Sequence, residues 1–425
     1  MKTVLSFLFL LVTGLLSAQS FTVVADSLRL PNGLEFDAQG RLWVTESGYG
    51  FDDGAVSIVQ PNGDLLPVVV NLAAFYDTTS QENVGPWHTA ALPGNQLGVL
   101  SPVDGGILLF DLGGFIPGVS QPLTAASATT VPIADFVFQN QPPGMGDSNP
   151  YTALQDANGN WFVADAGFNG IVKVEAGSGQ RSVFCKFDPI ANPLPIGPPV
   201  IDAVPTRIIA KPGGGYYVCN LTGFPFPEGA ASVFEVSENG TVSALHTGLT
   251  MLTDLVLDAA TGNLYALQIG TFDLSIFNFA PNSAKVWRIH PDGSKEIVAE
   301  NFDLAPGMAI DGQGILYVSE LASGRILRFD GVTGAHSPAD ELIALSLSPN
   351  PANTFVRVHF TLDAETPVTL RLLDARGALL QTRNLGRLGS GLHESELELS
   401  QYPAGLYWAE VRTVSGTKTM QVVKY

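Results

Sequence analysis

Short apolar runs rich in Val, Ile, Leu, Phe and Tyr alternate with turn sequences along most of the chain. The stretch from Ala305 to Asp330 shows the unit: an apolar run, the turn DGQG, the run ILYVSE, a loop and the run GRILRFD. Runs of this length bounded by Asp-Gly, Asn-Gly and Pro predict β-strands joined by tight turns. Because no apolar stripe with helical spacing persists, the pattern predicts an all-β fold.

The same unit recurs from residue 21 to about residue 331, and its second strand is the most recognisable part. A degenerate copy, QLGVLS (Gln96–Ser101), lies between the first two clear copies, and TVPIADF (Thr130–Phe136) is its expected fourth strand. Six units of four antiparallel strands predict a six-bladed β-propeller. The clear copies are RLWVTE (Arg41–Glu46), NWFVAD (Asn160–Asp165), YYVCN (Tyr216–Asn220), NLYALQ (Asn263–Gln268) and ILYVSE (Ile315–Glu320).

The last unit lacks a fourth strand after Asp330. The opening stretch FTVVADSLRLPNG (Phe21–Gly33) resembles KEIVAENFDLAPG (Lys295–Gly307), which contains the fourth strand of another unit. We therefore expect the N-terminal strand to complete the last blade and close the ring, leaving no open sheet edge.

Long connections gather on one predicted face. In a propeller, the second-to-third and fourth-to-first connections lie on the same side, and here they are rich in aromatic residues and Pro. Long loops on the rim of a rigid scaffold are the usual place for binding, so we expect a ligand surface there. These loops are Ser47–Gly54, Asn71–His88, Gln139–Tyr151, Asp188–Pro205, Leu221–Gly229 and Gly270–Ser283.

The two ends of the chain differ from the middle. Lys2 followed by the apolar run Val4–Leu16 and the small residue Ala18 predicts a secretory signal peptide over residues 1–18. No other segment is long and apolar enough to span a membrane. From residue 21 to 340 there are 12 basic and 32 acidic residues, and from 341 to 425 there are 8 of each, so a domain boundary is expected near residue 340.

The domain organisation that follows has four parts. They are a signal peptide (1–18), a six-bladed propeller (19–332), a linker (333–344) and a small Ig-like β-sandwich of alternating strands (345–425). The formal charge of −19 argues against nucleic acid and anionic membrane surfaces as partners. Cys185 and Cys219 fall in predicted strands of different units, and the sequence leaves open whether they are buried thiols or a disulfide.

The tail resembles the type A sorting domain of the bacterial type IX secretion system. The matching segments are SPNP (Ser348–Pro351), LRLLDARGALL (Leu370–Leu380), LSQYPAGLYWAEV (Leu399–Val411) and the terminal Lys424–Tyr425. The resemblance implies export across the outer membrane by the type IX machinery. It also implies removal of the tail, which would leave the protein secreted or on the cell surface.

The propeller is similar to NHL-type repeats and, more narrowly, to the ScyD/ScyE family. The segments that carry this resemblance are Asn149–Glu175, Val204–Ala210, Leu221–Val236 and Asp254–Gly270. The family implies an exported propeller, and it implies no settled reaction for any residue here.

A ladder of polar residues ends the five clear second strands: Glu46, Asp165, Asn220, Gln268 and Glu320. These side chains could ring a ligand, and four of them, Glu46, Asp165, Asn220 and Glu320, could hold Ca²⁺, which prefers oxygen ligands. Alternatively, each could cap the loop of its own blade by bonding backbone amides, which a repeated position favours. Three converging side chains would support the first role.

Few other residues suggest chemistry. No zinc motif, nucleophile elbow or phosphate-binding loop is present. His88, next to Trp87 at the start of an inner strand, is a candidate general base near Glu46 or Asp165, or else a structural histidine. Phe224 and Phe226, in the sequence FPFP, could form a ligand platform or a self-packed loop, and Tyr151 lies at the end of another face loop.

The sequence therefore favours an exported binding module that holds a small molecule, glycan or protein on its loop-rich face. The candidate binding residues are Glu46, Trp87, His88, Tyr151, Asp165, Asn220, Phe224, Phe226, Gln268 and Glu320. The alternative is a metal-assisted hydrolase or lactonase at the channel mouth, with Ca²⁺ on the ladder and His88 moving protons. A purely structural surface protein is the third interpretation.

Overall fold

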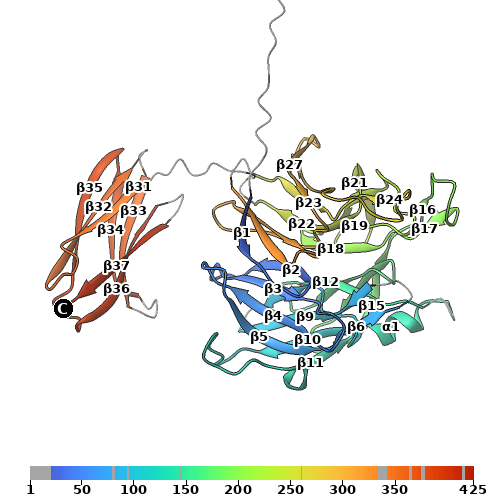
Figure 1. Ribbon diagram of the computed structural model, residues 1–425, viewed down its shortest axis with the longest axis horizontal. Coiled ribbons are helices and arrows are strands. Elements are labelled where there is room, and N and C mark those ends of the chain that lie inside the picture. Colours follow the sequence, from blue (N-terminus) through green and yellow to red (C-terminus); the bar gives the residue numbers. More distant parts are fainter. Residues whose placement is uncertain are drawn as a thin grey trace, which may run out of the picture.

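The computed structural model describes residues 21–78, 82–92, 95–142, 146–259, 261–330, 332, 342–362, 366–374, 379–413 and 417–425. The predicted signal peptide and most of the predicted linker lie outside these residues. Figure 1 shows two groups of sheets, the propeller in blue to orange and the tail in orange to red. Each group is described by itself below.

Six four-stranded antiparallel sheets form the blades of the propeller. Blade 1 contains β2 (Pro31–Phe36), β3 (Leu42–Glu46), β4 (Gly54–Val59) and β5 (Leu65–Leu72). Blade 2 contains β8 (Thr89–Leu92), β9 (Gln96–Ser101), β10 (Gly106–Asp111) and β11 (Thr129–Pro132). Blade 3 contains β12 (Pro150–Gln155), β13 (Trp161–Asp165), β14 (Gly170–Val174) and β15 (Arg181–Lys186).

The second half of the ring has the same plan. Blade 4 contains β18 (Pro205–Ala210), β19 (Tyr216–Asn220), β20 (Ala231–Val236) and β21 (Val242–Leu249). Blade 5 contains β22 (Leu252–Leu257), β23 (Leu264–Gln268), β26 (Ala284–Ile289) and β27 (Lys295–Phe302). Blade 6 contains β28 (Met308–Ile310), β29 (Leu316–Glu320), β30 (Arg325–Phe329) and the N-terminal β1 (Phe21–Ala25).

The ring closes as the sequence predicts. Strand β1 pairs antiparallel with β30, placing Phe21 opposite Phe329 and Thr22 opposite Arg328. The innermost strands contact each other in order around the ring, and β28 of blade 6 contacts β2 of blade 1. Strand β1, from the other end of the propeller sequence, therefore covers the outer edge of β30, and this edge is not exposed.

The core lies between the blades. Second-strand residues such as Val44, Val99, Val163 and Val218 are fully buried, because both faces of each sheet are covered by neighbouring blades. Strands buried on two faces read as continuous apolar runs, which is why the second strands were the clearest signal in the sequence. Cys185 and Cys219 are buried, unpaired thiols within this core.

Blade 2 departs from the prediction. The run Thr130–Phe136 was expected to be one strand, but β11 ends at Pro132 and the helix α1 (Ala134–Gln139) follows. The amides of Ile133 and Ala134 both donate to the carbonyl of Gly105, 2.9 Å away, and this turns the chain. A short apolar run does not by itself distinguish a strand from a helical turn, and here tertiary bonds decide.

Small additional elements decorate the loops. The hairpin β6 (Phe75–Asp77)–β7 (Glu82–Val84) lies between blades 1 and 2, and a 3₁₀ turn (Ala125–Ser127) precedes β11. The hairpin β16 (Ile190–Ala191)–β17 (Val200–Ile201) lies between blades 3 and 4. The pair β24 (Phe272–Asp273)–β25 (Asn278–Phe279) lies within the long loop of blade 5.

The tail forms a small β-sandwich, as expected. One sheet contains β31 (Leu342–Ser348), β32 (Phe355–Leu362) and β35 (Gly391–Glu398). The other contains β34 (Leu379–Leu388), β33 (Thr366–Asp374), β36 (Gly405–Arg412) and β37 (Thr417–Lys424). Alternate residues such as Val356, Val358 and Phe360 are buried between the sheets. Strand β31 begins at Leu342, inside the range predicted as linker.

Candidate functional site

The ladder of polar residues lies at the loop-rich ends of the second strands, and each carboxylate bonds its own surroundings. Glu46 accepts the backbone N–H of Arg29 at 2.6 Å. Asp165 accepts the amides of Asn149 at 2.8 Å and Phe168 at 2.9 Å, and the hydroxyl of Ser148 at 2.7 Å. These bonds fix the loops that enter and leave each blade.

Glu320 is bonded in the same way but is also paired. It accepts the amide of Asp303 at 2.9 Å, the hydroxyl of Ser323 and the guanidinium of Arg325. Burial by itself would raise the pKa of Glu320, but these bonds and the Arg325 charge outweigh it and lower that pKa. Glu46 has less compensation, so burial raises its pKa.

The two amide members of the ladder hold face loops. Asn220 donates to the carbonyl of Ala203 at 2.8 Å and accepts the amide of Ser232 at 2.7 Å, closing the loop of blade 4. Gln268 donates to the Thr271 hydroxyl at 3.0 Å and to the Gly270 carbonyl at 3.2 Å in the loop of blade 5. Both amides therefore set the shape of the loops that follow them.

These contacts do not fit a shared calcium site. Glu46, Asp165, Asn220 and Glu320 each use their oxygens on groups of their own blade and its entry loop, which is the pattern of the capping role. Among the described residues, no group of three or more His, Cys, Asp or Glu side chains is placed to hold a metal ion.

A second polar set lies on the inner strands, at a position that is equivalent in all six blades. In each blade, the residue two positions before the polar end of the second strand pairs with a residue of the inner strand. The member of the set is the residue directly before that inner-strand residue. We call this set the channel layer because its members line the ring axis. The channel layer consists of Gly33, His88, Thr152, Arg207, Asp254 and Gly307.

Charged side chains of the channel layer meet across the ring. His88 Nε2 lies 3.5 Å from Asp254 Oδ2, and Arg207 Nε lies 3.3 Å from Asp254 Oδ1. Arg207 Nη1 lies 3.1 Å and 3.2 Å from the two ring nitrogens of His88. Glu35, two residues beyond Gly33 on β2, has Oε2 3.9 Å from His88 Nδ1. We call these four residues the channel network; they come from blades 1, 2, 4 and 5 and can meet only at the axis.

The channel network is unevenly accessible. Asp254 and His88 are buried, with the Asp254 side chain fully inaccessible, whereas the Glu35 side chain is 27% exposed. Asp254 Oδ2 also accepts the amide of Met308 at 2.8 Å. Gly33 leaves room for the His88 side chain, because a Cβ at position 33 would lie 2.6 Å from the His88 ring. Glu35 is thus the most accessible member of the network.

The two carboxyl groups of the network have oppositely shifted pKa values. Burial raises the pKa of Glu35 despite the opposing charges of Arg207 and His88. Burial would also raise the pKa of Asp254, but the Arg207 charge and the hydrogen bond from His88 outweigh it and lower that pKa. One carboxyl is therefore favoured as the acid and the other as the carboxylate, an arrangement that acid–base sites use.

Of the channel network, only His88 was singled out in the sequence. His88 was expected near Glu46 or Asp165, and its side chain instead lies beside Glu35, Arg207 and Asp254. Glu35, Arg207 and Asp254 share no local motif, since they are separated by whole blades. Aligning the six inner strands by their turns would have revealed charged residues in a column that otherwise holds Gly or Thr.

Two predicted aromatic residues lie above the network at the loop-rich end of the channel. Trp87 and Tyr151 are half-buried, and their ring centroids are 5.8 Å apart. Trp87 Nε1 donates to Asn149 Oδ1 at 2.7 Å, which fixes the orientation of the indole. Burial raises the pKa of the Tyr151 phenol. The charge of Asp254 raises this pKa further, whereas the charge of Arg207 lowers it.

Phe224 and Phe226 belong to a larger aromatic cluster on the loop-rich face, which we call the phenylalanine patch. Its members are Phe224, Phe226, Phe272, Phe277 and Phe279, from the loops of blades 4 and 5. Neighbouring ring centroids in the patch lie between 5.3 and 6.2 Å apart. Phe224 is 39% exposed and Phe277 is 67% exposed, so the patch is self-packed yet open to solvent.

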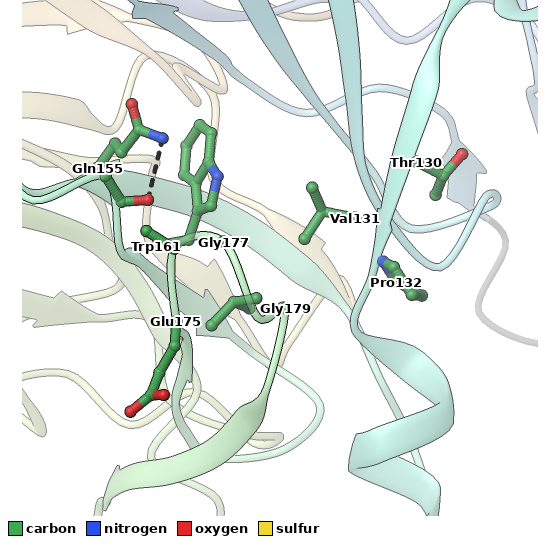
Figure 2. A pocket seen from close by; sticks show the side chains of 11 residues that line it. Thr130, Val131, Pro132, Gln155, Trp161, Glu175, Gly177 and Gly179 are labelled. Carbon is green, nitrogen blue, oxygen red and sulfur yellow. Dashed lines mark hydrogen bonds between the residues drawn. The ribbon is translucent and has the colours of Figure 1, made fainter.

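A pocket of about 460 Å³ lies between the outer strand of blade 2 and the turns of blade 3. Figure 2 shows Trp161 and Gln155 on one side and Val131 and Pro132 on the other, with the Gln155 amide bonded to the Gly159 carbonyl. Its lining includes one carboxylate, Glu175, and no other charged side chain. We therefore assign no chemistry to it.

Comparison with known proteins identifies the tail. Residues 346–425 match the secretion system C-terminal sorting domain. A search of curated proteins found no match to the chain. No helix in the described part of the chain has the length and hydropathy of a membrane span. The sorting-domain match shows that the protein is exported by the type IX secretion system to the cell surface or the surroundings.

Solved structures similar to the chain include propeller proteins of several kinds. A gluconolactonase from Xanthomonas campestris has 11% identity and a TM-score of 0.48, with 72% of this chain and 88% of that chain covered. Regucalcin, a calcium-binding protein from Agrobacterium tumefaciens, has 14% identity and a TM-score of 0.46, with 74% and 94% covered. PorZ, a surface component of the type IX secretion system of Porphyromonas gingivalis, has 14% identity and a TM-score of 0.41, with 95% and 61% covered. The propeller assignment itself rests on the sheets of this chain.

Proposed function

We propose that this protein is an extracellular binding module whose ligand surface is the loop-rich face of the propeller. The observation that carries the proposal is the phenylalanine patch, in which five rings from two blades are held together at the surface. Phe226 and Phe277 have positive φ values of 56° and 52°, a costly conformation for aromatic residues. Such local strain is concentrated at ligand clamps and active sites.

The ladder supports this surface rather than contacting a ligand. Gln268 bonds Thr271 in the loop that carries Phe272, and Asn220 bonds Ser232, which directly follows the loop that carries Phe224, so both amides help to preorganise the patch. A preformed aromatic surface loses little conformational freedom on binding, which favours affinity. In this proposal the ScyD/ScyE resemblance describes the scaffold, and the patch provides the specificity.

The test is capture of ligands by the secreted protein on a glycan array and from culture and cell-surface extracts. We expect Phe277→Ala to weaken binding about tenfold or more, as loss of an aromatic anchor does, with an unchanged melting temperature. Val119→Ala is the matched control, because Val119 is 75% exposed in the β10–β11 connection, away from the patch. Absence of any ligand, or binding indifferent to Phe224→Ala and Phe277→Ala, would refute the proposal.

A hydrolase acting at the channel is the second candidate, and the channel network is the observation that favours it. Glu35 and Asp254 have pKa values shifted in opposite directions on either side of His88, as an acid–base pair requires. In this version, Glu35 exchanges the proton because it is the accessible member, and Asp254 orients His88.

Activity assays on lactones and esters separate the two candidates. The hydrolase requires hydrolysis that falls at least about a hundredfold in Glu35→Gln, in line with loss of a general acid or base. Adding a chelator in the same assay tests the metal-assisted version. Binding that depends on Phe277, together with full indifference of any turnover to Glu35→Gln, would leave only the binding module.

A further inference from the structure

Aromatic side chains also gather at blade 1, on the same face as the phenylalanine patch. Tyr49 and Phe51 lie in the β3–β4 loop, and Phe75 and Tyr76 lie in β6. All four are exposed, Phe51 by 84%, and the backbones of Phe51 and Phe75 are joined by an isolated β-bridge. We call this group the blade 1 patch; its rings are not needed by the core.

The three aromatic groups of this face belong to different blades of the ring. Inner strands follow each other around the ring from β2 through β8, β12, β18 and β22 to β28. Blade 4 is therefore opposite blade 1, and the Trp87–Tyr151 pair lies between them at the channel mouth. The blade 1 patch, this pair and the phenylalanine patch form an aromatic track across the loop-rich face.

The charge of the face loops limits the classes of ligand that can bind along the track. The six long face loops contain nine carboxylates and no Lys or Arg. An anionic polymer or a phosphate-bearing ligand would meet an excess of like charge in these loops. The nine residues are Asp52, Asp53, Asp77, Glu82, Asp147, Asp188, Asp202, Glu228 and Asp273.

We propose that the aromatic track binds one extended polysaccharide chain built of uncharged or amino-bearing sugars. This inference rests on the proposed function and adds the ligand class to it. The apolar C–H face of a sugar ring packs on the negative face of an aromatic ring. An ammonium group on the sugar is attracted by both the rings and the surrounding carboxylates.

The spacing of the rings favours a polysaccharide over a folded protein. A protein interface has a contiguous apolar core with a polar rim. Here the aromatic groups are separate, with polar loops between them, and each presents a few rings. A polymer with a repeating sugar unit can occupy separate platforms at once, and simultaneous occupation raises its overall affinity.

The experiment measures the affinity of the secreted protein for short and long oligosaccharides by calorimetry. The probes are glucose-, N-acetylglucosamine- and glucosamine-based series, each from disaccharides to long chains. We expect a long chain of at least one series to bind roughly a hundredfold more tightly than its disaccharide. Phe51→Ala and Phe277→Ala should each weaken long-chain binding and reduce its gain over the disaccharide. Val119→Ala should change neither.

Three outcomes would overturn the inference. In the first, affinity does not depend on chain length, or Phe51→Ala leaves the long-chain affinity intact. In the second, no series binds the wild-type protein. In the third, a protein is captured through Phe277 and no glycan is. The first and third outcomes contradict the polysaccharide inference but not the proposed binding function. After the second outcome, the proposed function is decided by the capture test with the Phe224 and Phe277 variants.

Discussion

The two faces of the propeller are made by the two ends of the same strands, yet their connections differ. On the turn face, Asp37, Asp156 and Asp311 occupy equivalent places in three blades. Each accepts two backbone amides through Oδ1, at 2.8 to 2.9 Å, and so closes the first turn of its blade. On the loop-rich face, the connections differ in length, and their aromatic residues contact one another between blades 4 and 5.

Repetition is therefore informative about role. A polar residue that recurs at one position and bonds the turn or loop of its own blade is explained by that turn or loop, as the turn-face aspartates and the ladder are. Residues that differ between blades and meet across the ring, such as those of the channel network, are not explained by the repeat. The difference teaches that function should be sought where the repeat is broken.

The largest expected effect comes from breaking the channel network. Asp254→Ala leaves Arg207 buried without its partner, so we expect the free energy of unfolding to fall by about 3–5 kcal/mol. Chemical denaturation of the secreted protein measures this change. The double variant Arg207→Met/Asp254→Leu should recover much of the loss, because it removes both charges. A loss below about 1 kcal/mol in Asp254→Ala would show that the network does not hold the inner strands together.

The ladder gives an intermediate effect with a pH signature. The pKa of Glu320 is lowered by its bonds and by Arg325, so its stabilising contribution is present above its unfolded pKa and is lost as the pH falls. We expect Glu320→Gln to cost about 1.5–3 kcal/mol at neutral pH and less in acid, measured by denaturation across the pH range.

Glu46→Gln is the matched comparison. Burial raises the pKa of Glu46, so the folded state disfavours its charge, and this cost appears as the pH rises through the folded pKa. Removing the charge should change stability at neutral pH by less than about 1 kcal/mol, because the amide oxygen still accepts the Arg29 amide. Equal losses in Glu46→Gln and Glu320→Gln would contradict the assigned pKa directions.

The turn face should show the smallest effects. Asp156→Ala removes an acceptor for Asn158 and Asn160 at an exposed turn, so we expect a loss of about 1 kcal/mol. Asp37→Ala should cost somewhat more, since Asp37 Oδ2 also accepts the guanidinium of Arg41 and the indole N–H of Trp43. The melting temperatures of both variants should fall, that of Asp37→Ala further, with no change in ligand binding; a loss of binding would move the functional surface to this face.

The blades were predictable because each strand pair is encoded locally. The tight turns and the apolar second strands identified five copies clearly, and the likeness of Phe21–Gly33 to Lys295–Gly307 identified the closing strand. The helix Ala134–Gln139 was missed because the bonds of Ile133 and Ala134 to Gly105 are tertiary. Arg207 and Asp254 were missed for the same reason: their partners lie on other blades.

The candidate surface was only partly visible in the sequence. The position of the long loops follows from the strand order, so the face could be predicted, and Phe224 and Phe226 were noted there. The joining of Phe272 and Phe277 to them depends on how two loops fold against each other. No local pattern encodes that packing.

The most direct test of the central claim, that the loop-rich face is the binding surface, is hydrogen–deuterium exchange of the secreted protein with its tightest-binding oligosaccharide. We predict slower exchange in the loops 47–54, 221–229 and 270–283, where the blade 1 patch and the phenylalanine patch lie. Turns 37–41 and 156–160 on the opposite face should be unchanged. Protection confined to the turn face or to the tail would contradict the claim.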